Sequence, residues 1–143
     1  MVVMAVDYGD AHTGVAFSDP TGLLVGQTTV IHSRQRDAVL DELARLARER
    51  GAGALVIGLP RNMDGTEGPR AALYREFAAL AGERLGLEPV LWDERRTTVD
   101  AHRILQEAGK NARKRKKTVD AVAASLILEG YLTRLQVERE RDV

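Results

Sequence analysis

Residues 2–18, VVMAVDYGDAHTGVAFS, comprise two apolar runs on either side of a polar turn that begins after Asp7. Val2–Asp7 is typical of a buried strand, and Gly14–Ser18 predicts a second strand. A DPTG turn and the β-branched run Thr28–His32 follow, and they predict a third strand. The start of the chain therefore predicts a three-stranded antiparallel meander.

After the meander the apolar spacing changes to that of helices alternating with short strands. The pattern predicts helices over 36–50 and from Pro69, strands over Ala54–Leu59 and Pro89–Glu94, a short helix over 97–109, and a last helix capped by Thr118 and ending near Leu135. The inner stripe expected for the helix from Pro69 is Leu73, Tyr74, Phe77, Ala78, Ala81 and Leu85. This order predicts an α/β fold: one five-stranded mixed sheet with helices on both faces.

Length and composition limit the classes of protein. With 143 residues the chain fits one domain, expected over 1–136, with a charged tail over 137–143 that we expect to fray. The 21 basic and 21 acidic residues cancel, so net charge indicates no partner. No cysteine is present, which excludes disulfides and thiol chemistry. No apolar run approaches the ~20 residues of a membrane span, and no signal peptide is indicated, so we expect a cytoplasmic protein without membrane contact.

Two acids follow predicted strands and a third opens the last helix. Asp7 and Glu94 stand at strand ends, and Asp120 lies in the first turn predicted after Thr118. Ligands bind at the carboxyl ends of strands in open α/β sheets. Converging carboxylates favour Mg²⁺ or Mn²⁺, and two such ions could stabilise the attacking and leaving oxygens of a phosphodiester displacement.

Each acid also has a simpler interpretation. Asp7 could be a turn residue, Glu94 could pair with Arg95 or Arg96, and Asp120 could complement a helix dipole.

A basic run precedes the last predicted helix. Residues 110–117, KNARKRKK, hold six cations and no acid. We interpret the run as a phosphate-contacting loop that binds without sequence preference, although a solvated charge run is the alternative. Its cations beyond Lys110 are Arg113, Lys114, Arg115, Lys116 and Lys117.

Two glycine-containing turns add candidate contacts. Arg61 and Asn62, between a strand and a helix, could reach a phosphate or sugar, or could belong to a plain connection. In the turn after Asp7, Gly9 would let the backbone approach a ligand closely. His12 could contact a phosphate, or it could be a surface residue without a functional role. His32 and His102 have no partners at ligand spacing and are interpreted as structural.

Taken together, four motifs resemble those of the YqgF/RuvX family. They are DYG with GVA at 7–9 and 14–16, GLPRNMDGTE at 58–67, DERRTT at 93–98, and KTVDAVAA at 117–124, in the family's order across residues 3–132. The resemblance implies an RNase H-like fold and assigns Asp7, Glu94 and Asp120 to the family's three metal-binding acids. His12 stands where the family usually has Lys or Arg, and Trp92 and Arg96 also replace commoner residues.

The resemblance implies a metal-dependent nuclease that matures the 5′ end of pre-16S rRNA, with resolution of Holliday junctions in branched DNA as the alternative. Arg95, Arg61, Asn62 and the basic run would position the nucleic acid, and a homodimer would suit a four-way junction. Two other classes stay open: a nucleic-acid-binding protein without catalysis, and an actin-like nucleotide-binding domain. The second class needs two related lobes, and the chain has length for one.

Overall fold

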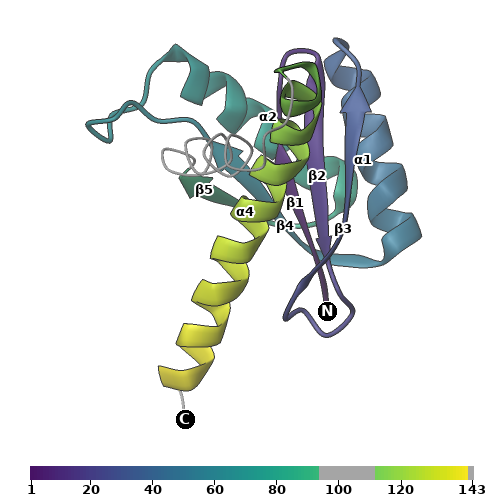
Figure 1. The fold of residues 1–143 in the computed structure, drawn as a ribbon, viewed down its shortest axis with the longest axis vertical. Coiled ribbons are helices and arrows are strands. Elements are labelled where there is room, and N and C mark those ends of the chain that lie inside the picture. Colours follow the sequence, from purple (N-terminus) through teal and green to yellow (C-terminus); the bar gives the residue numbers. More distant parts are fainter. Residues whose placement is uncertain (94–111, 142–143) are drawn as a thin grey trace.

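The computed structural model describes residues 1–93 and 112–141, with backbone alone over 112–120. Its five strands form one sheet in the order β3-β2-β1-β4-β5 (Figure 1). The strands are β1 (Val2–Asp7), β2 (His12–Ser18), β3 (Val25–His32), β4 (Ala52–Leu59) and β5 (Pro89–Asp93). β1, β2 and β3 pair antiparallel, whereas β4 pairs parallel with both β1 and β5. The mixed sheet predicted from the sequence is confirmed.

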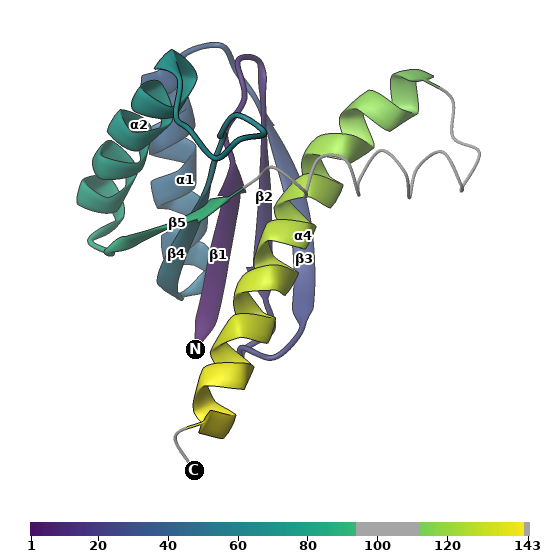
Figure 2. The same cartoon turned by 90° about the vertical axis from the view of Figure 1, so that its left-hand side faces the viewer.

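Helices cover both faces of the sheet. α1 (Arg36–Arg50) and α2 (Pro69–Leu85) lie on one face, and α4 (Ala112–Arg141) lies on the other (Figure 2). α1 and α2 each end at a glycine in the left-handed conformation, Gly51 and Gly86, with φ of 66° and 69°. Only glycine adopts that conformation without strain, which explains why both helices end where they do.

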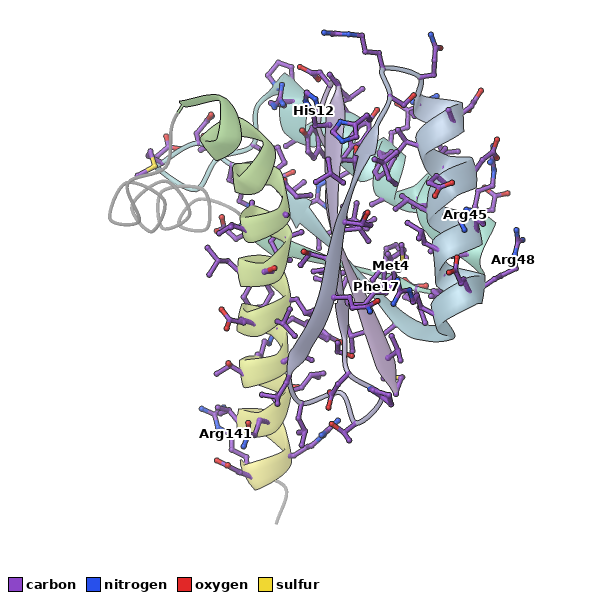
Figure 3. The ribbon with its side chains drawn as sticks, turned by 45° about the vertical axis from the view of Figure 1, so that its right-hand side comes forward. Met4, His12, Phe17, Arg45, Arg48 and Arg141 are labelled. Atoms are coloured by element: carbon purple, nitrogen blue, oxygen red, sulfur yellow. The ribbon has the colours of Figure 1, made fainter. Side chains whose placement is uncertain are left out.

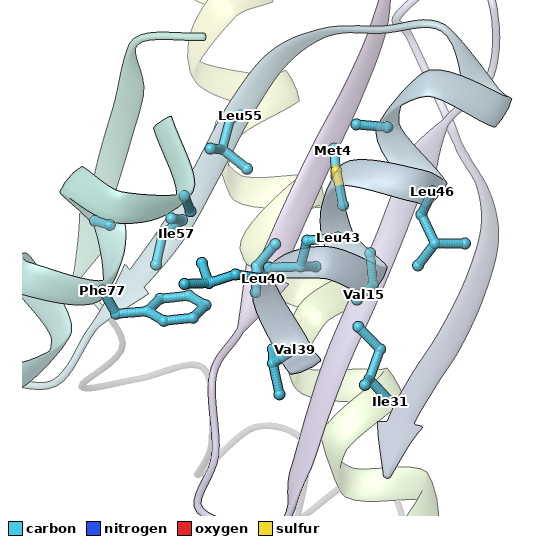
Figure 4. Packing of buried hydrophobic residues seen from close by; sticks show 14 of the residues in the cluster. Met4, Val15, Ile31, Val39, Leu40, Leu43, Leu46, Leu55, Ile57 and Phe77 are labelled. Carbon is cyan, nitrogen blue, oxygen red and sulfur yellow. The ribbon is translucent and has the colours of Figure 1, made fainter. Parts of the chain in front are cut away.

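Residues that alternate along the strands separate two apolar layers. Met4 and Val6 of β1 pack with Leu40, Leu43 and Phe77 under α1 and α2 (Figure 4). The intervening residues face α4: Val3, Ala5, Ala16, Val56, Ile127 and Leu128 form the second layer. Because β1 is buried on both faces, its sequence is a continuous apolar run instead of an alternating one. Burial of each large side chain contributes about 1.5–3 kcal/mol.

The last helix differs from its prediction at both ends. It begins at Ala112, not Thr118, so residues 112–117 of the basic run are helical instead of a loop. Lys, Arg and Ala are good helix formers, which explains the early start despite the unfavourable cations at the helix N-terminus. The helix continues to Arg141, so residues 137–141 of the expected tail are helical in the structure.

Smaller differences concern single positions. Leu73 is 44% exposed, because it lies about 100° around the helix from Tyr74, at the edge of the buried stripe. The short helix predicted over 97–109 lies outside the described residues. Within the part of the chain that the structure describes, no helix is long and apolar enough to cross a membrane.

Candidate functional site

Asp7 is the last residue of β1 and pairs with Gly14 of β2. It lies on the face that α4 covers, because it alternates with Val3 and Ala5. The parallel register pairs Val6 with Ile57, so the next position of β4, level with Asp7, is Gly58. Asp7 is half-buried. A glycine therefore stands on each neighbouring strand, and Asp7 is the one residue of the three that carries a side chain.

The end of β5 lies at the same edge of the sheet. Gly58 pairs with Trp92 and Leu59 with Asp93, so the chain leaves β5 one position beyond the level of Asp7. Glu94 follows directly in the sequence. Glu94 and Arg95 lie outside the described residues.

α4 runs in the direction opposite to β1, so its first turns lie toward the end of the molecule where β1 ends (Figures 1 and 2). Its buried positions Ala123, Ala124, Ile127 and Leu128 pack on the sheet. Asp120 precedes Ala123 and Ala124 by three and four residues, so helical spacing places it on the same stripe. Among the side chains that the structure describes, no three Asp, Glu or His could hold a metal ion. The side chains of two of the three predicted ligands, Glu94 and Asp120, are not among those described.

The turn after Asp7 is tight. A Cβ atom at Gly9 would lie 2.2 Å from the carbonyl oxygen of His12, so the turn itself requires glycine there. The Gly9 amide donates to Oγ1 of the buried Thr13 at 3.4 Å. Close approach of the backbone within the turn explains why this residue is glycine.

α2 holds the residue that follows Asp7. The Tyr8 ring stacks on Phe77 with centroids 3.8 Å apart and meets Tyr74 edge-on at 5.4 Å. The Tyr74 hydroxyl donates to the Tyr8 carbonyl oxygen, and Arg70 donates to that hydroxyl at 3.0 Å. Arg70 also lies 4.0 Å from Asp10 in the same turn. This network anchors the backbone beside Asp7.

Sequence reasoning missed this network. Arg70 and Tyr74 have i,i+4 spacing, which was the available signal for their contact. The partnership of Tyr8 with residues 66 and 69 positions later depends on tertiary packing.

The loop between β4 and α2 is internally hydrogen-bonded. The Asn62 side-chain amide donates to Thr66 Oγ1 at 3.0 Å, and Thr66 Oγ1 donates to Asp64 at 2.6 Å. The Asn62 and Thr66 backbones are joined at 2.8 Å. Asn62, predicted to contact nucleic acid, therefore holds the loop together.

Arg61 lies near the same loop's Glu67. Its guanidinium is 3.7 Å from the Glu67 carboxylate, which also accepts two hydrogen bonds from Arg75 at 2.7 and 2.8 Å. The Arg75 hydrogen bond, followed by the charges of Arg75 and Arg61, holds the pKa of Glu67 below its usual value. The Arg61 side chain is 34% exposed, so it remains accessible from solvent.

His32, interpreted from the sequence as structural because no partner stands at ligand spacing, lies beside His12 in the structure. The two residues are opposite each other in the β2–β3 register, and their ring centroids are 5.0 Å apart. Because His12 alternates with Gly14 and Ala16, both histidines lie on the face that carries Asp7. His102 lies outside the described residues.

The predicted nucleic-acid contacts thus divide into three groups. Gly9, His12, Arg61 and Asn62 lie at the edge of the sheet where β1 ends. Arg113, Lys114, Arg115, Lys116 and Lys117 form the first turns of α4. Arg95 and the first two residues of the basic run, Lys110 and Asn111, lie outside the described residues.

With this geometry established, residues 1–134 match the RuvX family, which is described as Holliday junction resolvase. The chain belongs to the RuvX family. A relative from Carboxydothermus hydrogenoformans, named "Putative pre-16S rRNA nuclease", is 44% identical to this RuvX protein over 132 residues, which cover 92% of the chain and 96% of the relative.

Two solved structures share the fold of this RuvX protein. RuvC of T. thermophilus in complex with a Holliday junction substrate aligns with a TM-score of 0.61 and 14% identity, over 95% of this chain and 96% of that one. The fowlpox virus resolvase with Holliday junction DNA aligns with a TM-score of 0.60 and 12% identity, over 94% and 99%. The expected RNase H-like fold is confirmed.

Family membership makes this RuvX chain a nuclease, a hydrolase of phosphodiester bonds. The two solved structures are both complexes with a Holliday junction. Of the functions considered from the sequence, membership favours the nuclease over the nucleotide-binding domain.

Proposed function

We propose that this RuvX protein is a divalent-metal-dependent endonuclease that processes the 5′ end of pre-16S rRNA in the cytoplasm. The observation that supports it is the placement of Asp7 at the end of β1, at the edge of the sheet where β4 and β5 also end, with Gly14 and Gly58 on the neighbouring strands. Relatives at 44% and 45% identity carry the name of a pre-16S rRNA nuclease.

Asp7, Glu94 and Asp120 are the proposed ligands of Mg²⁺ or Mn²⁺. Carboxylate oxygens suit these hard ions, and the glycines beside Asp7 leave both of its flanks without side chains. Bound ions would stabilise the negative charge that develops during phosphodiester hydrolysis. Among the three proposed ligands, Asp7 is the one whose surroundings are described: the hydrogen bond from Tyr74 to the Tyr8 carbonyl oxygen fixes the backbone beside it.

The remaining predicted residues bind and orient the nucleic acid. Arg61, oriented by Glu67, and His12 approach the phosphate backbone from two sides of Asp7. Arg95 and the cations at 113–117 add contacts, and these contacts carry no sequence preference. Gly9 and Asn62 act through the shapes of their turns. We assign residues 1–136 to the nuclease domain.

Resolution of Holliday junctions is the second candidate. It is favoured by the description of the family and by the fold shared with two resolvases. A two-fold homodimer of this protein would match the symmetry of a four-way junction.

The test is a cleavage assay on three end-labelled substrates with Mg²⁺ or Mn²⁺: a precursor-like stem RNA, single-stranded RNA and a four-way DNA junction. We expect the wild type to cut the stem RNA fastest, and Asp7→Asn to lower the rate at least a hundredfold. Glu88→Gln is the matched control, since Glu88 is an exposed acid just before the start of β5, at the end of the sheet away from Asp7, and it should retain most activity.

Each contrary result has a separate meaning. Preferential cutting of the junction would select the second candidate. Binding without cleavage of any substrate, with either metal, would leave a nucleic-acid-binding protein. Full activity of Asp7→Asn would refute the assignment of Asp7.

A further inference from the structure

The corner between β3 and α1 lies beside the candidate site on the side away from Arg61. The backbone amide of Ser33 donates to the carbonyl oxygen of Ala11 at 3.0 Å, which joins this corner to the turn after Asp7. Ser33 Oγ also accepts from the Gln35 amide at 3.1 Å, so the corner is fixed on both sides of Arg34. Arg34 is therefore presented from a rigid backbone at the edge of the sheet where β1 ends.

Arg34 is available to a ligand. Its side chain is exposed, and among the described residues it forms no ion pair. By contrast, Arg36 pairs with Glu76 at 3.3 Å and Arg61 lies 3.7 Å from Glu67. The permanent charge of Arg34 suits a phosphate, which a guanidinium binds through two parallel hydrogen bonds.

The paired histidines continue from Arg34 toward Asp7. His32 is two residues before Arg34 and is exposed, and its ring meets that of His12. His12 is on the face of Asp7, two positions from Gly14, the partner of Asp7. Each imidazole offers an N–H donor to a phosphate oxygen, whatever its charge. Arg34 lies two residues beyond His32, the last residue of β3, and we call Arg34, His32 and His12 the β3 row.

We propose that the β3 row binds the phosphodiester backbone of the nucleic acid where it leaves the cleavage site, on the side opposite Arg61. This inference rests on the proposed function. It adds Arg34 and His32 to the residues that contact the nucleic acid. The nucleic acid would then run from the loop at 60–68 across the end of β1 to the β3–α1 corner. The inference also makes His12 one of the three residues of the row, at a position where the family usually has a permanent cation.

The experiment measures the salt dependence of binding in an Asp7→Asn background, so that the nucleic acid is not cleaved. The probes are a fluorescein-labelled stem–loop RNA and a labelled four-way DNA junction, and anisotropy gives the dissociation constant from 50 to 200 mM KCl. Loss of one phosphate contact lowers the slope of log affinity against log salt by about one. We expect Arg34→Gln to show this change, and Arg34→Lys to restore the slope.

Arg48→Gln is the matched control. Arg48 is also an exposed arginine without an ion pair among the described residues, but it lies near the C-terminal end of α1, far along the helix from the β3–α1 corner (Figure 3). Its removal should leave the slope unchanged. His32→Ala should weaken binding roughly three- to tenfold by removing one donor to a charged acceptor. All these sites are exposed, so thermal melting should show each variant folded.

The outcomes separate this inference from the proposed function. Equal slopes for Arg34→Gln and Arg48→Gln would overturn the inference and leave the proposed function intact. If the Asp7→Asn protein with an intact row binds neither probe, the proposed function fails and the inference fails with it. A change on one probe alone would support the row and identify which nucleic acid follows it.

Discussion

At the scale of single residues, the Tyr74 hydroxyl links α2 to the backbone that follows Asp7. It donates to the Tyr8 carbonyl oxygen and accepts from Arg70. The Tyr74 ring, buried and in contact with Tyr8, supplies packing that does not need the hydroxyl. The hydroxyl and the ring can therefore be tested separately.

Tyr74→Phe keeps the ring and removes the hydrogen bond. We expect a loss of about 1 kcal/mol in the free energy of unfolding, as for one net hydrogen bond. If the bond positions Asp7, kcat should fall several-fold with KM nearly unchanged, and a higher metal concentration should be needed for half-maximal activity. Tyr131→Phe, at a ring that meets Trp92 instead, is the control. A stability loss with unchanged kcat would leave Tyr74 a packing residue only.

At the scale of elements, α4 and β5 meet at a position without a side chain. A Cβ atom at Gly130 would lie 2.6 Å from Cζ2 of Trp92, so the indole ring occupies the space beside the helix. Trp92 pairs with Gly58, next to Asp7, and precedes Glu94 by two residues. The packing of α4 on β5 therefore bears on the geometry of the site.

Gly130→Ala sets two effects against each other. Alanine favours the helix by about 1 kcal/mol, but overpacking against an aromatic ring costs about 1–3 kcal/mol. Because the contact is so short, we expect net destabilisation, measured by urea unfolding. With Trp92→Phe also present, the smaller ring should make Gly130→Ala neutral or stabilising. Equal effects in both backgrounds would show that the indole does not set the requirement for glycine.

The sequence predicted the elements well where a single pattern determined them. The apolar run of β1 and the helical spacing over 36–50 are local signals, and both predictions are confirmed. The start of α4 was wrong, because Thr118 is a good cap and the preceding cations were interpreted as a loop. The position of Asp7 at the end of a strand followed from the order of the predicted strands. The His12–His32 pair depends on the β2–β3 register, and the predicted strand Gly14–Ser18 was too short to include His12.

At the scale of the whole molecule, several acids stabilise the folded chain through the hydrogen bonds that their carboxylates accept. The Asp19 carboxylate accepts a hydrogen bond from the Thr21 hydroxyl at 2.6 Å and further hydrogen bonds from two backbone amides. These bonds, chiefly the one from Thr21, lower the pKa of Asp19 below the usual 3.8. Hydrogen bonds from Arg75 and Arg45 likewise lower the pKa values of Glu67 and Glu42 below 4.5. In the unfolded chain these carboxyls bind protons more readily than in the folded chain.

The pH dependence of stability follows from the direction of these shifts. The stabilisation is complete above the unfolded pKa values and is lost as pH falls through the lower folded values. These groups should leave the urea concentration at the unfolding midpoint nearly unchanged between pH 7 and pH 5. Once the pH is lowered beyond about 4, we expect that concentration to decrease. Asp19→Asn removes one of them and should make the fall shallower. An identical fall in that variant would exclude Asp19 as a contributor.

The two faces of the sheet are covered differently, since α4 and Asp7 share one face and α1 packs on the other. This separation offers a practical handle for single-molecule work. The chain has no cysteine, so Arg48→Cys on the exposed side of α1 would introduce a unique thiol. A dye or a surface tether attached there would report on the enzyme, or immobilise it in one orientation, on the face of the sheet opposite Asp7.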